Sequence, residues 1–127
     1  VVAGVGAEGA GDDVVDAELQ CMLEAGQQRL ALARAWALSP AVLFLDEPTA
    51  SLDPASTLAV EALIERAHAA GTKIVLVTHD LGQARRLADE MVFIHRGRVV
   101  EQTPADWFFA RPRSAAAQAH LAGNIFL

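Results

Sequence analysis

The chain has 127 residues and a mass of 13.5 kDa, so it holds at most one modest domain. Its formal net charge of -6 and pI near 5.0 argue against a general nucleic-acid-binding protein, because the phosphate backbone requires a basic surface. Hydrophobic residues make up 53% of the sequence. Even so, no uninterrupted apolar run approaches the ~18 residues that cross a bilayer. The single cysteine and the lack of a secretory signal pattern predict a soluble cytoplasmic domain.

The first segment, residues 1–21, is rich in Gly, Ala and Asp and shows no strong period. It has no aromatic anchor, so we expect it to be poorly ordered or weakly helical. The stretch "GVGAEG" at residues 4–9 fits the pattern G-x-G-x-x-G. No predicted strand precedes it, and we interpret the match as chance.

The rest of the sequence predicts alternating strands and helices. The good helix formers of residues 27–38 end at Ser39-Pro40, and Asp53 is a suitable N-cap for a helix that starts at Pro54. The predicted elements are a helix at 27–38, a strand at 41–46, a helix at 54–70, a strand at 73–78, a helix at 80–89, a hairpin at 91–102 and two short helices at 104–110 and 114–122. This order is typical of an α/β fold with a parallel sheet covered by helices on both faces.

Two adjacent carboxylates, Asp46 and Glu47, follow the apolar run "AVLFL" of the first predicted strand. Ligands of α/β sheets bind beyond the carboxyl ends of the strands, and a carboxylate there needs a cation or a hydrogen-bonded partner. Mg²⁺ is the cation that shares itself between carboxylate and phosphate. The simpler interpretation is that the two acids end a strand and face solvent.

Three stretches resemble the ATP-binding subunits of ABC transporters, in that family's order and spacing. "QQRLALARA" resembles the helix after the signature motif, "DEPTASLDP" the Walker B motif and D-loop, and "THD" the switch histidine. The resemblance implies that residues 22–127 are the C-terminal part of an ABC ATPase domain, a partial P-loop NTPase (RecA-like) core with a C-terminal hairpin and short helices. Residues 1–21 would then be a remnant of the helical subdomain.

The resemblance also implies roles for individual residues. Asp46 would bind Mg²⁺, and Glu47 would be the general base for the water that attacks ATP. His79 would contact the γ-phosphate, where an imidazole can donate to an anionic oxygen. Ser51 and Asp53 would lie in the D-loop, which communicates across a dimer of such domains.

Two parts of the family pattern are altered or missing. Aligned on "LEAGQ", the signature motif L-S-G-G-Q has Glu24 and Ala25 at the serine and first glycine positions, but one residue is then missing before Arg29. Aligned on Arg29, the motif becomes "MLEAG" and none of its essential residues is kept. In the first alignment, Gly26 and Gln27 match the last two positions of the motif, and we expect them to contact the nucleotide. The sequence has no G-x-x-x-x-G-K-[ST] loop, and its sole lysine is Lys73. We therefore expect a truncated ATPase that is inactive alone.

The leading hypothesis is an ATP-hydrolysing subunit of an ABC import system that uses ATP and Mg²⁺. Its tail resembles importers of phosphate, tungstate or polar amino acids, in which Trp107, Phe108 and Phe109 would pack the last helix on the sheet. Expected partners are membrane permease subunits, a second ATPase subunit and a solute-binding protein, with the chain peripheral on the inner face of the cell membrane. The alternative is a degenerate remnant without nucleotide hydrolysis, and a third hypothesis is a soluble ABC protein of DNA repair or translation.

Overall fold

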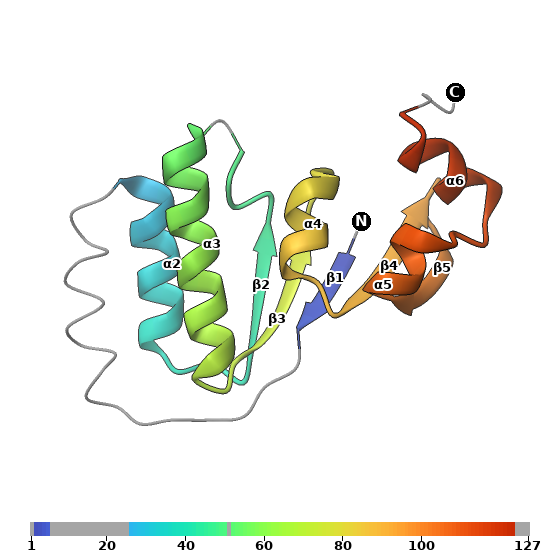
Figure 1. The fold of residues 1–127 in the computed structure, drawn as a ribbon. Helices are drawn as coiled ribbons and strands as arrows, with labels where there is room; N and C mark the ends of the chain where they lie inside the picture. Colours follow the sequence, from blue (N-terminus) through green and yellow to red (C-terminus); the bar gives the residue numbers. More distant parts are fainter. Residues whose placement is uncertain (1, 6–25, 51, 124–127) are drawn as a thin grey trace.

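A computed structural model describes residues 2–5, 26–50 and 52–123. Its centre is a five-stranded sheet in the order β2-β3-β1-β4-β5 (Figure 1). The strands are β1 (Val2–Val5), β2 (Val42–Asp46), β3 (Lys73–Val77), β4 (Glu90–His95) and β5 (Arg98–Pro104). Strands β2 and β3 pair in parallel, whereas β1 is antiparallel to both β3 and β4, and β4 is antiparallel to β5.

The helices confirm the predicted α/β fold. They are α2 (Gln27–Ala37), α3 (Pro54–Ala69), α4 (Leu81–Leu87), α5 (Ala105–Ala110) and α6 (Ala115–Leu121). Asp53 caps α3 by accepting a hydrogen bond from the N–H of Ser56, and Asp80 caps α4 in the same way through Gln83. The β4–β5 hairpin turns at Arg96 and Gly97, both with positive φ, as a tight two-residue hairpin turn requires.

Strand β1 is a correction to the sequence prediction. Residues 1–21 were expected to be poorly ordered or weakly helical, and for Val2–Val5 this is wrong. The stretch "VAGV" has a weak strand signal of its own. Hydrogen bonds to β3 on one side and to β4 on the other stabilise the strand conformation that the local sequence favours only weakly. Residues 1 and 6–21 lie outside the described residues, so for them the expectation stays a prediction.

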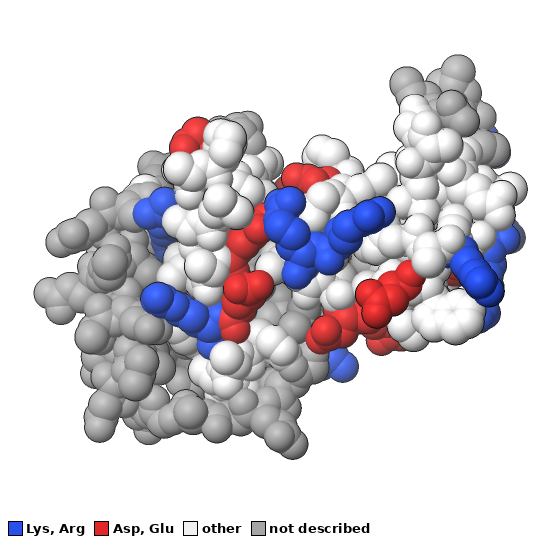
Figure 2. Space-filling view, viewed as in Figure 1, with Lys and Arg blue, Asp and Glu red and all other residues white. Residues whose placement is uncertain are grey.

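The hydrophobic core lies on one face of the sheet. Buried side chains of the strands there pack against buried side chains of the helices, and the largest include Leu43, Ile74, Leu76, Met91 and Phe93 of the strands and Trp36, Val60, Ile64 and Phe108 of the helices. Cross-strand partners share a face, and the register places these strand residues on one face, with β3 and β4 related through their pairing with β1. On this helical face, acidic and basic side chains are interleaved (Figure 2).

The opposite face of the sheet is open within the described part of the chain. Phe44 is 74% exposed, and Val42, Val77, Ile94 and Val99 are also exposed. The expectation of a sheet covered by helices on both faces is therefore wrong for the described part of the chain. None of the described helices is long and apolar enough to cross a membrane.

The three aromatic residues of the tail behave differently from one another. Phe108 is fully buried, with its ring centroid 5.8 Å from that of Phe93, and Phe109 meets Phe108 edge-on at 5.4 Å. Trp107 is 54% exposed, so the expectation that it packs the last helix on the sheet is wrong. Its neighbour on the surface is the guanidinium of Arg111, 6.0 Å from the ring centroid.

A buried carboxylate fixes the start of α6. Glu101, on β5, is 6% exposed and accepts hydrogen bonds from the N–H groups of Arg113 and Ser114 and from the Ser114 hydroxyl, at 2.9 to 3.1 Å. Burial alone would raise the pKa of Glu101, but these hydrogen bonds outweigh it and the pKa lies below its ordinary value. The charged form of Glu101 therefore stabilises the fold.

We expect Glu101→Gln to lower the free energy of unfolding by about 2 kcal/mol at neutral pH, because the charged acceptor is lost. A lowered pKa means that this stabilisation is present above the ordinary glutamate pKa and is lost as the pH falls through the lowered value. The difference between wild type and variant in urea unfolding should therefore shrink from pH 7 toward pH 3. A difference that stays constant over this range would contradict the assignment. Glu65→Gln, on the exposed side of α3, is the matched control.

Candidate functional site

The site begins where the chain leaves β2. Asp46, the last residue of β2, is exposed and pairs in register with Val77 of β3. The N–H of Glu47 extends the pairing by donating to the carbonyl oxygen of Val77 at 2.8 Å. The backbone of Glu47 then turns with a φ of 45°, in the left-handed region that non-glycine residues rarely occupy. Both carboxylates thus lie at the carboxyl end of the parallel β2–β3 pair, where α/β sheets bind ligands.

The Glu47 carboxylate contacts the segment that follows β3. Its Oε1 atom accepts a hydrogen bond from the backbone N–H of His79 at 2.8 Å and lies 2.5 Å from Nδ1 of the imidazole. Its Oε2 atom accepts a longer bond, 3.4 Å, from the hydroxyl of Thr78. The His79 side chain is 84% exposed and that of Glu47 31%. The structure therefore brings together the two residues predicted to be catalytic, with most of the imidazole open to solvent.

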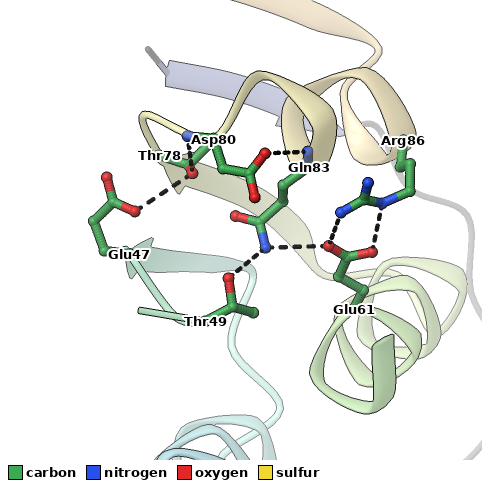
Figure 3. A network of polar contacts seen from close by, with 7 residues as sticks. All are labelled: Glu47, Thr49, Glu61, Thr78, Asp80, Gln83 and Arg86. Carbon is green, nitrogen blue, oxygen red and sulfur yellow. Dashed lines mark hydrogen bonds and ion pairs between the residues drawn. The ribbon is translucent and has the colours of Figure 1, made fainter. Parts of the chain in front are cut away.

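The residues after His79 hold this segment against the sheet. The N–H of Asp80 donates to the Thr78 hydroxyl at 3.0 Å, and the Asp80 carboxylate accepts from the N–H of Gln83 at 3.0 Å (Figure 3). Thr78 is 1% exposed. One threonine hydroxyl therefore serves both the turn into α4 and the Glu47 carboxylate.

A second, partly buried set of polar side chains joins the loop after β2 to helices α3 and α4 (Figure 3). The Gln83 amide nitrogen donates to the Thr49 hydroxyl at 2.8 Å and to Oε1 of Glu61 at 3.3 Å. Glu61 is 4% exposed and accepts from Nε and Nη2 of Arg86 at 2.9 and 2.7 Å. These hydrogen bonds raise the pKa of Arg86, which stays charged and compensates the buried carboxylate.

The other predicted contacts are less clearly defined. Gly26 is exposed and precedes α2 with a φ of 107°, which only glycine adopts without strain. Asp53 caps α3, and hydrogen bonds from Ser56 lower its pKa. Gln27 begins α2, and its side chain is not described. Ser51, like Glu24 and Ala25 of the altered signature, lies outside the described residues.

The carboxylates at the end of β2 suit a cation that takes only one or two ligands from the protein. No group of three or more His, Cys, Asp or Glu side chains that could hold a metal occurs among the described residues. Mg²⁺ commonly binds through one or two carboxylates and takes its remaining ligands from phosphates and water. The exposed Asp46 fits that requirement. Beside it, a hollow of about 290 Å³ is lined by α2 and by β2 residues from Leu43 onward.

Comparisons with known proteins agree with this geometry. The family described as "AAA domain, putative AbiEii toxin, Type IV TA system" matches residues 25–82. A solved structure described as the ATP-binding subunit of an ABC transporter superposes with a TM-score of 0.67 at 24% identity, covering 90% of this chain and 57% of that one. UvrA2 from Deinococcus radiodurans superposes with a TM-score of 0.59 at 30% identity, covering 74% of this chain and 12% of that one. The fold is that of ABC-type ATP-binding domains.

The curated proteins to which the chain is similar have more specific descriptions than the solved structures do. The chain is 45% identical over 98 residues to phosphate import ATP-binding protein PstB 1 of Vibrio parahaemolyticus, covering 77% of this chain and 36% of that protein. It is 44% identical over 105 residues to PstB of Aeropyrum pernix, covering 81% and 42%. The predicted resemblance to importer ATP-binding subunits is confirmed. The chain spans well under half the length of these relatives.

Sequence reasoning did not find the supporting residues Thr49, Glu61 and Gln83. For Glu61 and Gln83, the sequence did contain a signal of a buried polar role. Glu61 lies among the apolar residues Val60, Leu63 and Ile64 that α3 buries, and Gln83 lies beside the buried Ala84. A polar residue within an apolar helical stripe requires a buried partner, which indicates a polar network in the interior.

Proposed function

We propose that the chain is part of an ATP-hydrolysing subunit of an ABC import system. The observation that carries this proposal is the contact between Glu47 and His79 at the carboxyl ends of β2 and β3. The similarity to phosphate import ATP-binding proteins supports it and suggests phosphate as the transported solute. Permease subunits, a second ATPase subunit and a solute-binding protein would be its partners, and the inner face of the cell membrane its location.

In this proposal Glu47 is the general base. Its carboxylate would take a proton from the water that attacks the terminal phosphoryl group of ATP. His79 holds Oε1 of Glu47 through its backbone N–H, and its open imidazole edge would donate to the γ-phosphate. Asp46 would hold Mg²⁺, which, when bound, neutralises charge on the phosphates. Ser51 and Asp53 would face the second subunit, as would Gly26 and Gln27.

The altered signature supports the second candidate, a degenerate remnant without hydrolysis. At the helix N-terminus where the family brings a serine hydroxyl to the phosphate of the opposite subunit, Glu24 would add a negative charge. Repulsion of this kind weakens anion binding across the dimer. The two candidates differ in what happens once a phosphate-binding loop is supplied, since only the first would then hydrolyse ATP.

For this chain by itself, we expect no measurable binding of Mg-ATP. Its sequence has no G-x-x-x-x-G-K-[ST] loop whose backbone amides would surround the phosphates. Isothermal titration calorimetry at micromolar nucleotide should give a flat trace, with a complete phosphate import ATP-binding protein as the positive control. A saturating isotherm for this chain would contradict the expectation and would place a phosphate site elsewhere in it.

A further inference from the structure

The buried amide of Gln83 connects the two segments that carry Glu47 and His79. Thr49 belongs to the loop that Glu47 begins, and Gln83 belongs to the helix that His79 precedes. The Gln83 amide nitrogen donates to the Thr49 hydroxyl at 2.8 Å. We infer that Gln83 is a positioning residue that keeps Glu47 and His79 in contact. The importance of that contact for catalysis rests on the proposed function.

Burial decides which bond holds the two segments together. The Glu47 carboxylate, on a side chain that is 31% exposed, contacts both the backbone N–H and the imidazole of His79, and the imidazole side chain is 84% exposed. Exposed polar contacts of this kind typically contribute little, because water competes for both partners. Gln83 is 0% exposed, and a buried polar group that loses its partner costs about 1–3 kcal/mol. The Thr49–Gln83 bond therefore constrains the loop more strongly than the exposed contact does. The positions of Glu47 and His79 relative to each other depend on this bond.

Glu61 fixes the direction in which the Gln83 amide points. The amide nitrogen donates to Oε1 of Glu61 at 3.3 Å, and the same carboxylate accepts two hydrogen bonds from Arg86. Turning the amide over would set its oxygen against the Glu61 carboxylate, which can only accept hydrogen bonds. In Figure 3 the amide oxygen points away from Glu61, and this oxygen is buried without a hydrogen-bond partner. The Glu61–Arg86 pair thus orients the donor that holds the loop.

The test compares His79 imidazole signals by nitrogen-15 NMR, without nucleotide, in variants of the whole chain. His79→Asn assigns the signals, and Glu47→Gln gives the reference in which the carboxylate is lost. Gln83→Met keeps the side-chain length and removes both amide hydrogen bonds. We expect its His79 signals to move most of the way toward those of Glu47→Gln, although Glu47 is still present.

A matched pair at Thr49 separates positioning from general stability. Thr49→Ser keeps the hydroxyl and should leave the His79 signals as in wild type, whereas Thr49→Val should move them as Gln83→Met does. Leu63→Ala, a core change in α3, should lower stability without moving them. Wild-type His79 signals in folded Thr49→Val protein would overturn the inference, and Thr49→Val decides the question even if Gln83→Met does not fold. Because no nucleotide is used, the result stands apart from whether the chain contributes to ATP hydrolysis.

Discussion

Glu47→Gln should abolish ATP turnover in a chimera that supplies the missing phosphate-binding loop from a phosphate import ATP-binding protein. The glutamine carbonyl can still accept the hydrogen bond that the backbone N–H of His79 gives to Oε1 of Glu47. It cannot take a proton from water, and loss of a general base costs roughly 10²- to 10⁴-fold in rate. Binding of ATP should persist, because no contact to the phosphates is removed. Phosphate release and equilibrium binding of a labelled nucleotide measure the two effects separately.

A matched substitution shows whether the loss is specific. Glu65→Gln makes the same chemical change at an exposed position of α3 and should leave turnover unchanged. Turnover in Glu47→Gln within tenfold of the unmodified chimera would remove Glu47 from the role of general base. A chimera that binds ATP but has no turnover even with Glu47 intact would favour the degenerate remnant instead.

Most of the fold could be predicted because local signals and tertiary environment agree. Pro54 after Asp53 predicts the start of α3, and Arg96-Gly97 predicts the turn of the hairpin, and both are found. Strand β1 could not be predicted, since "VAGV" forms a strand through pairing on both sides. The exposure of Phe44 was also missed, because an apolar run does not reveal whether one face or both are covered.

The sequence predicted the polar residues at the strand ends, but it did not predict the side chains that hold them in place. Asp46, Glu47 and His79 stand out because polar residues directly follow apolar strands. Their meeting in space follows from the parallel pairing of β2 with β3. Glu61 and Arg86 lie on two different helices and 25 positions apart in the chain, and no local pattern predicts that they pair.

Arg86→Met should lower the free energy of unfolding by about 2–3 kcal/mol, somewhat less than the ~3–5 kcal/mol that breaking a fully buried ion pair costs. The side chain of Glu61 is only 6% exposed, so without Arg86 its charge is left in the interior with the Gln83 amide as its remaining donor. The Arg86 side chain is 48% exposed, and water reaching the vacated position reduces the loss. Chemical denaturation monitored by circular dichroism measures the change.

The neighbouring arginine and a double variant provide the controls. Arg85→Met removes a guanidinium that lies 4.6 Å from the Phe109 ring centroid, and it should cost less than about 1 kcal/mol. Glu61→Met combined with Arg86→Met should be more stable than Arg86→Met alone, because the double variant leaves no unpaired buried charge. If instead the two losses simply add, Glu61 and Arg86 are not coupled. The Glu61–Arg86 ion pair would then have no part in orienting Gln83.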